Sequence, residues 1–347
     1  MSQCTLPIEV DSLEITVVVD NETDGMSSTP GGLVLGQFDR LFRDHRHPCT
    51  SKGADCYEFQ FPDACCAAHG LSLLITAKAG NTVHQVLFDT GPYEDIFQQN
   101  AKRLNLNFSE IDAVVLSHWH IDHSGGLLSV AQKCAEAENQ VNIDLHPDRP
   151  DGRGTKLGQD QYVAWTADPT FEALEITGAK LTKSSQIHTI CDDMFLVSGE
   201  IPRLTSYELG VPSHVRWFED DNQWQPDPLI MDERFLAVNI KEKGIVLFTG
   251  CSHAGVINAC HEARRIFGPL VPLYMIIGGF HLAGHQVEKR IESTVQDMLS
   301  LNPAYLAPGH CTGWRAKAAL EQAFPGRLVP SAVGNIFKIS DTIQTLP

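Results

Sequence analysis

The feature that most constrains this chain is the hexapeptide HWHIDH at residues 118–123, which follows the apolar run AVVLS and precedes two glycines. His118 and His120 are two residues apart in an extended turn, so both imidazoles can point toward one metal ion. Asp122 and His123 follow as the chain turns into a helix, and they can hold a second ion. Open α/β folds place their sites at the ends of strands. The motif therefore predicts a metal site where a strand ends.

Short apolar runs rich in β-branched residues recur along the chain, and helical patterns lie between some of them. Because strands and helices are mixed from end to end, the pattern predicts an α/β fold. We expect strands at 13–20, 71–77, 84–91, 113–118, 139–147, 194–199, 234–240, 244–250, 273–279 and 304–310. We expect helices at 94–106, 125–138, 257–268 and 288–301.

Two segments interrupt this rhythm. Residues 21–66 are rich in Gly, Pro, Asp, His and Cys, and residues 148–190 begin as a loop with few clear strands. Long segments of this kind in compact domains are usually functional or disordered. We interpret both as insertions in a single domain that spans residues 1–347, and the second as a cap over a pocket.

Composition and net charge limit the classes of partner that we expect this chain to bind. The net charge of −17 argues against a general nucleic-acid surface, which would be basic. No window approaches the roughly 18 uninterrupted apolar residues of a membrane span. The start of the chain, MSQCTLPIEVDS, lacks the basic and apolar parts of a secretory signal, and the ten cysteines are scattered. We therefore expect a cytoplasmic protein with reduced thiols that acts on a small molecule, not on nucleic acid or a membrane.

HWHIDH is the H-x-H-x-D-H signature of the metallo-β-lactamase superfamily, and the chain resembles that superfamily from about residue 69 to 312. LFDTGP precedes the signature, and VLFTGC and YLAPGH follow it in the superfamily's order. The segments HGLSLLI, SGEIPR, FTGCSHAG, GGFHL and GHCTG resemble one branch, named dihydropterin-ribofuranosyl-aminobenzene-phosphate synthase-like. The resemblance implies an αββα sandwich, with two mixed sheets face to face, helices outside and metals at one edge.

The resemblance also implies roles for residues outside the signature. Asp89 matches an aspartate that steadies the ligand loop, and His310 matches the final metal histidine. Cys251 stands where the superfamily usually has an aspartate, or a cysteine in some branches, and is a candidate thiolate ligand. His281 is a candidate for binding a substrate phosphate or carboxylate, and His69 for supporting the site.

The third ligand of the first metal is open. In the superfamily pattern, a third metal histidine follows a strand that lies between the signature and the strand ending at Gly250. At the corresponding place this chain has Glu200, in the segment SGEIPR. We prefer His253, which lies two residues past Cys251 and can face the same centre. Glu200 is the alternative, as a ligand or as a base beside the site.

These residues predict a metal-dependent hydrolase of a small ester, thioester, lactone or phosphoester. Two divalent ions, expected to be zinc with manganese or iron as alternatives, lower the pKa of a bound water to give hydroxide. Asp122 also orients that hydroxide, and the basic residues Arg149 and Arg153 offer contacts for an anionic substrate. Three other functions stay open: a di-iron redox enzyme, a transferase of the synthase type, and a non-catalytic metabolite-binding protein.

Overall fold

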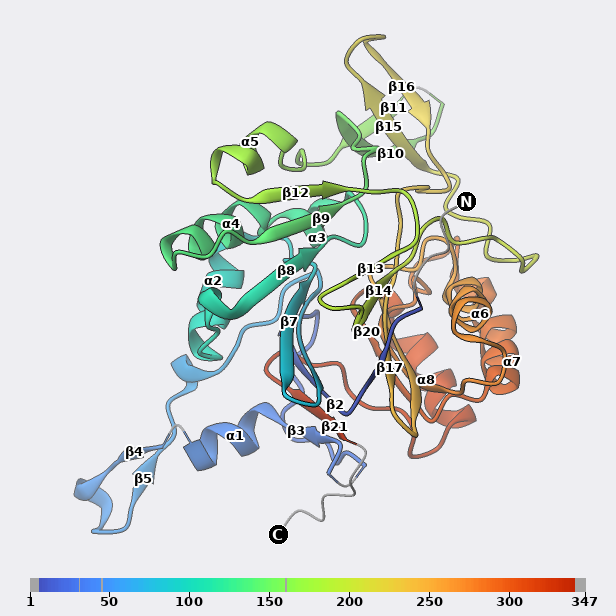
Figure 1. The fold of residues 1–347 in the computed structure, drawn as a ribbon. Helices are drawn as coiled ribbons and strands as arrows, with labels where there is room; N and C mark the ends of the chain where they lie inside the picture. Colours follow the sequence, from blue (N-terminus) through green and yellow to red (C-terminus); the bar gives the residue numbers. More distant parts are fainter. Residues whose placement is uncertain (1–5, 31, 45, 160, 341–347) are drawn as a thin grey trace.

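A computed structural model describes residues 6–30, 32–44, 46–159 and 161–340 (Figure 1). Two large sheets form its centre. The first has the strand order β12 (Lys180–Lys183), β9 (Asn142–Leu145), β8 (Ile111–Val115), β7 (Thr82–Phe88), β6 (Ser72–Ala79), β2 (Ser12–Val19), β21 (Ile336–Ser340) and β3 (Val34–Leu35). The second has the order β13 (His188–Ile190), β14 (Phe195–Val197), β17 (Leu236–Ile240), β18 (Gly244–Thr249), β19 (Leu273–Gly279) and β20 (Tyr305–Gly309), with β1 (Glu9–Val10) beside β17.

The core lies between these two sheets. In β2, the alternate residues Leu13, Ile15 and Val17 are buried in one cluster with residues of the second sheet. Phe88 of β7 meets Phe248 of β18 across the interface, with ring centroids 6.4 Å apart. Both sheets are buried on their other faces as well, which explains why their strands are continuous apolar runs in the sequence.

Helices cover the outer faces and complete four layers (Figure 1). The first sheet packs against α2 (Glu94–Arg103), α4 (Leu127–Glu136) and α5 (Phe171–Ile176). The second sheet packs against α6 (Val256–Phe267), α7 (Ile291–Leu301) and α8 (Trp314–Ala323). The α/β class and the αββα layering match the prediction, and each of the ten expected strands is present.

Short 3-10 helices complete these layers: η1 (Thr50–Lys52), η2 (Phe61–Asp63), η3 (Phe108–Glu110), η4 (Glu288–Arg290) and η5 (His310–Thr312). Within the ranges that the structure describes, no helix combines the length and the apolar character needed to cross a membrane.

The 21–66 segment contains β3, α1 (Gln37–Asp44) and a hairpin of β4 (His47–Pro48) and β5 (Tyr57–Glu58). This hairpin extends away from the two sheets (Figure 1). Four phenylalanine rings pack together beside it instead of joining the main cores: Phe38, Phe42, Phe59 and Phe61.

The expectation that residues 148–190 contain few strands is wrong. β10 (Gly152–Leu157) and β11 (Gln161–Ala164) pair with β15 (His214–Phe218) and β16 (Gln223–Pro226) in a separate four-stranded antiparallel sheet. β10 is GRGTKL and β11 is exposed along its length, so these two strands lack the apolar runs on which the prediction depended. Cross-strand aromatic pairs stabilise the sheet instead, including Trp217 with Trp224 at 5.4 Å between ring centroids.

Candidate metal centre

The motif 118–123 lies at the end of β8, as predicted, and a carboxylate under it fixes its shape. Asp89 follows β7 with a left-handed backbone (φ 58°), which is uncommon for a residue other than glycine. Its Oδ1 accepts the backbone N–H of Ser117 at 2.7 Å, and its Oδ2 accepts the Ser117 hydroxyl at 2.8 Å. Oδ2 also lies 2.6 Å from Nδ1 of His123. Asp89 therefore ties both ends of the ligand loop together, in the place predicted for it.

Three imidazoles form the first cluster, which we call the three-histidine group: His118, His120 and His253. Nε2 of His118 lies 2.9 Å from Nδ1 of His120, and Nε2 of His253 lies 3.2 Å from that same atom. The three side chains are almost completely buried. The structure therefore brings His253 to the place for which it and Glu200 were the alternatives.

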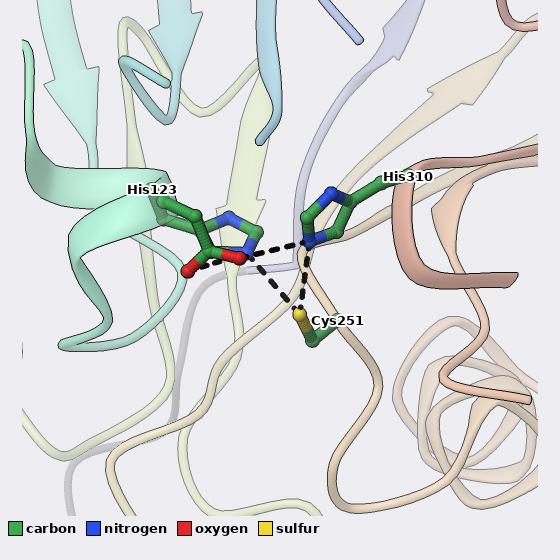
Figure 2. Close-up of side chains that lie close together, drawn as sticks. His123, Cys251 and His310 are labelled. Carbon is green, nitrogen blue, oxygen red and sulfur yellow. Dashed lines mark hydrogen bonds and ion pairs between the residues drawn. The ribbon is translucent and has the colours of Figure 1, made fainter. Parts of the chain in front are cut away.

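Four side chains form the second cluster, which we call the mixed group: Asp122, His123, Cys251 and His310. Figure 2 shows His123, Cys251 and His310 pointing toward one another from three separate segments. The Sγ of Cys251 lies 3.2 Å from Nε2 of His123 and 3.2 Å from Nε2 of His310. Oδ2 of Asp122 lies 3.3 Å from Nε2 of His310. His118 and His123 link the two groups, with ring centroids 4.4 Å apart.

Hydrogen bonds to the outer ring nitrogens indicate which inner nitrogens carry lone pairs. The Ser117 hydroxyl donates to Asp89, so at 2.9 Å it accepts a hydrogen bond from Nδ1 of His118. Nδ1 of His123 donates to the Asp89 carboxylate, and Nδ1 of His310 donates to Oδ1 of Asn21 at 3.1 Å. In His118, which burial keeps neutral, Nε2 is then unprotonated and faces the cluster, which is the arrangement that a metal ligand requires. In His123 and His310, Nε2 also faces the cluster and becomes a donor once its proton is lost.

The distances between donor atoms also fit metal ions. Two donors about 2.1 Å from a tetrahedral zinc ion lie about 3.4 Å from each other. The donor atoms within each group lie within 4.8 Å of one another, and the pairs described above are 2.9 to 3.3 Å apart. Imidazole, carboxylate and thiolate are ligands for first-row metals. Both groups are therefore suitable metal sites.

The charge states of the two groups differ. Burial lowers the pKa of His118, His120 and His253 well below the ordinary imidazole value, so these rings are neutral. Burial opposes ionisation of Asp122, but His123 and His310 outweigh it and hold the pKa of this carboxyl well below its usual range. The three-histidine group therefore offers uncharged donors, and the mixed group includes a carboxylate.

The loop after β18 carries Cys251 and His253, and a buried acid holds it. The Glu233 carboxylate accepts the backbone N–H of His253 at 2.8 Å and that of Ala254 at 2.6 Å. Gly250 begins the loop, and a Cβ added there would meet the Ser117 hydroxyl at 2.2 Å. The close approach of the two ligand loops thus requires glycine. Sequence reasoning missed Glu233, which no motif marks.

His310 follows β20 and is held by residues from the other end of the chain. Its backbone N–H donates to Oδ1 of Asp20 at 2.8 Å, and Oδ2 of Asp20 accepts the Ser331 hydroxyl. Nδ2 of the Asn21 side chain also lies 2.9 Å from Nδ1 of His69. Asp20 and Asn21, which follow β2, therefore position His310, and no motif in the sequence marks this role.

A cavity of about 880 Å³ opens over both groups. His69 and His281, both predicted near the site, line it, and Nε2 of His69 lies 3.5 Å from Oδ2 of Asp122. Trp165 and His214, which sequence reasoning missed, line it as well. Trp165 follows β11, and His214 begins β15. The 148–190 segment, which contains Trp165, therefore borders the pocket, as predicted of a cap.

The structure does not bring Glu200, the alternative to His253, into either group. Its side chain is exposed and is absent from both groups and from the cavity lining of the described residues. β14 ends at Val197, before Glu200, and Nε2 of His253 lies 3.2 Å from Nδ1 of His120. His253, which the sequence analysis preferred, comes from the later loop after β18.

Comparisons with known proteins agree with this geometry. Residues 84–187 match the model of the β-lactamase superfamily domain. The chain is 29% identical, over 78% of its length and 90% of the relative, to 7,8-dihydropterin-6-methyl-4-(β-D-ribofuranosyl)-aminobenzene-5'-phosphate synthase of Methanocaldococcus jannaschii. An uncharacterized protein of that organism is 29% identical over 79% of this chain and 94% of its own.

Two solved structures share the fold. The first is Tm1679, a metal-dependent hydrolase of the β-lactamase superfamily, with a TM-score of 0.66, 22% identity, and coverage of 95% of this chain and 100% of the other. The metallo-β-lactamase fold protein YhfI of Bacillus subtilis follows, with a TM-score of 0.50, 12% identity and the same coverages. The chain therefore has the metallo-β-lactamase fold, and its predicted resemblance to that superfamily is confirmed.

Proposed function

We propose that this protein is a metal-dependent hydrolase that uses two divalent metal ions on a small-molecule ester, thioester, lactone or phosphoester. One observation carries the proposal: two adjacent groups of ligand atoms lie at the floor of a single cavity. His118, His120 and His253 would hold one ion. Asp122, His123, Cys251 and His310 would hold the other.

The metals and the chain have separate parts in this reaction. A pair of bound dications supplies a hydroxide nucleophile at neutral pH and stabilises the negative charge that develops on the substrate. Asp122 presents its carboxylate to the cavity, where it can accept a hydrogen bond from the attacking water. His281 also lines the cavity, and its ring can hydrogen-bond an oxygen of the substrate. His69 lies beside Asp122 and fixes the direction of that carboxylate.

The donor set favours zinc. Cys251 is a soft ligand when deprotonated, and histidine nitrogens suit zinc, copper, iron and nickel. Burial raises the pKa of the Cys251 thiol well above its ordinary value, so in this site a cation is needed to hold it as thiolate. Zinc takes four ligands of these types in tetrahedral geometry.

A transferase of the synthase type is the second candidate, because a protein of that name is 29% identical over most of this chain. Both functions use the same residues, so the products must distinguish them. Transfer would join the two parts of a donor and an acceptor, whereas hydrolysis adds water to one substrate.

The test is a panel of para-nitrophenyl esters and phosphoesters, with zinc-loaded protein, metal-free protein and His120→Ala. We expect the zinc-loaded protein to release para-nitrophenol from at least one of them. Metal-free protein and His120→Ala should lose that activity on the order of 1000-fold. His261 is exposed in the middle of α6 and belongs to neither ligand group, so His261→Ala serves as the matched control. Equal activity in wild type and His120→Ala would contradict the proposal.

A further inference from the structure

Apolar side chains line part of the cavity, some of them directly beside the ligand groups. Trp165 stands over the three-histidine group, and its ring centroid lies 4.9 Å from that of His120. The carbonyl of Arg153 anchors it by accepting the Trp165 backbone N–H at 2.8 Å. Leu128, Pro169 and Ile121 line the same cavity. These side chains offer a substrate apolar contact and one aromatic face.

None of the described residues that line this cavity is a lysine or an arginine. The two arginines of the 148–190 segment are engaged elsewhere. Arg149 donates to the backbone carbonyls of Pro150, Asp168 and Pro169. Arg153 is buried and pairs with Asp227 and Asp232. A substrate group that extends away from the metals therefore finds no cationic side chain on these walls.

Two imidazoles on these walls have a ring nitrogen without a hydrogen-bond partner among the described residues. His214, from β15, is 9% exposed, and its Nδ1 is buried without a hydrogen-bond partner. Nδ1 of His281 is also buried and unpartnered. The two ring centroids are 6.3 Å apart. These rings can exchange hydrogen bonds with a ligand.

Acidic side chains lie at the mouth. Glu94 and Asp95 begin α2, are exposed, and line the cavity. Like charges repel across such distances, and salt screens this repulsion only in part. An anionic tail that pointed toward the mouth would therefore approach two carboxylates.

We propose that this cavity selects a substrate whose non-reacting part is uncharged and apolar, aliphatic or aromatic, with a hydrogen-bonding atom that faces His214 and His281. The inference rests on the proposed hydrolase function and names its substrate class. A substrate that carries a phosphate or carboxylate on its non-reacting part is disfavoured.

A matched pair of esters tests it. Para-nitrophenyl hexanoate and the para-nitrophenyl monoester of adipic acid have the same length and leaving group, but the second ends in a carboxylate. We expect the zinc-loaded protein to have a kcat/KM about tenfold or more higher for the hexanoate. Equal values, or a preference for the adipate ester, would overturn the proposal.

Variants of the walls show where the preference comes from. Trp165→Ala should raise KM for the hexanoate about tenfold through lost apolar contact, with a smaller change in kcat. Trp314 is 69% exposed on α8, so Trp314→Ala is the matched control and should change neither value. Ala167 is exposed and lines the cavity, so Ala167→Lys should improve kcat/KM for the adipate ester about tenfold. An unchanged preference in both Trp165→Ala and Ala167→Lys would contradict the assignment.

A binding measurement separates this proposal from the proposed function. Hexyl para-nitrophenyl ether and its ω-carboxylate counterpart cannot be hydrolysed, and their nitrophenyl ring quenches tryptophan fluorescence. The neutral ether should bind about tenfold more tightly, and His214→Phe should weaken its binding while the metal content stays unchanged. If neither ester is cleaved but the neutral ether binds more tightly, the hydrolase proposal fails and the selectivity stands. If an ester is cleaved but the two ethers bind equally, the hydrolase proposal stands and the selectivity fails.

Discussion

The two ligand groups lie side by side, but the structure supports them differently. In the mixed group, both imidazoles have a partner on the outer nitrogen: Asp89 for His123 and Asn21 for His310. In the three-histidine group only His118 has one. Nε2 of His120 and Nδ1 of His253 are buried without a hydrogen-bond partner among the described residues. Hydrogen bonds therefore orient both imidazoles of the mixed group, whereas two rings of the three-histidine group lack such a bond on the outer nitrogen.

This difference has a physical consequence. Partners of the outer nitrogens typically contribute 10–100-fold in metal affinity. The mixed group also contains a carboxylate, whose negative charge would attract a dication directly, and a thiol that a bound cation would hold as thiolate. We therefore expect the mixed group to hold its metal more tightly, while the ion of the three-histidine group faces the substrate side of the cavity.

The largest effect should come from removing the central ligand of the three-histidine group. Nδ1 of His120 is the atom that both His118 and His253 approach, so His120→Ala should reduce turnover on the order of 1000-fold. The mixed group should keep its metal in this variant. Loss of all metal from His120→Ala, with the fold intact by circular dichroism, would show that the two groups are not independent.

The next effect should come from the support of the mixed group. Asp89→Ala removes the partner of His123 and both bonds to Ser117, and we expect metal affinity to fall about 100-fold. Titration with zinc against a competing chelator measures it. Asp112→Ala is the matched control, since Asp112 is half-exposed on β8 away from the ligands. An unchanged affinity in Asp89→Ala would contradict the orienting role.

A chelator should then separate the two groups. In protein loaded with two cobalt ions, only the mixed group contains a thiolate, from Cys251, so only its ion gives a thiolate-to-cobalt charge-transfer band. On stepwise chelation, activity should disappear before this band does. Cys251→Ser should lack the band from the start. Loss of the band before activity would reverse the order of affinities inferred from the hydrogen bonds.

The smallest effect lies outside both groups and concerns stability. Burial opposes protonation of His188, but its hydrogen bond to Asp144 at 2.7 Å outweighs this and raises the pKa of the ring above its unfolded value. The stabilisation is therefore complete below about pH 6.5 and is lost as pH rises through the folded-state pKa. Because the ring is partly exposed, we expect about 0.5 kcal/mol.

Urea unfolding at several pH values measures this contribution. The free energy of unfolding of the wild type should fall between pH 6.5 and 8 more than that of His188→Gln. Parallel profiles for the two proteins would place the pH dependence elsewhere, including in the metal ligands.

The sequence predicted the part of the site that is contiguous or adjoins a strand end. Four residues of the site lie within one hexapeptide, so their spacing alone shows that they can share a site: His118, His120, Asp122 and His123. His253 could be anticipated because it lies two residues from Cys251 at the end of a clear apolar strand.

The rest of the site depends on contacts between distant segments. His214 and Trp165 reach the cavity from polar strands or their flanks, which have no apolar period to reveal them. Glu233, Asp20 and Asn21 act through backbone N–H groups or outer ring nitrogens of other loops. Such bonds leave no pattern in a single sequence. Glu200 was kept as an alternative to His253 because order along the chain alone does not give position in space.

The central claim is that the two groups bind two metal ions. Plasma mass spectrometry of protein purified without added metal or chelator tests it most directly, expressed as metal per chain. We expect about two ions per chain in the wild type, mainly zinc, and about one in His120→Ala. Less than about 0.2 of any metal per chain, with none bound on reconstitution, would contradict the claim, because sites of this donor chemistry bind their metals tightly.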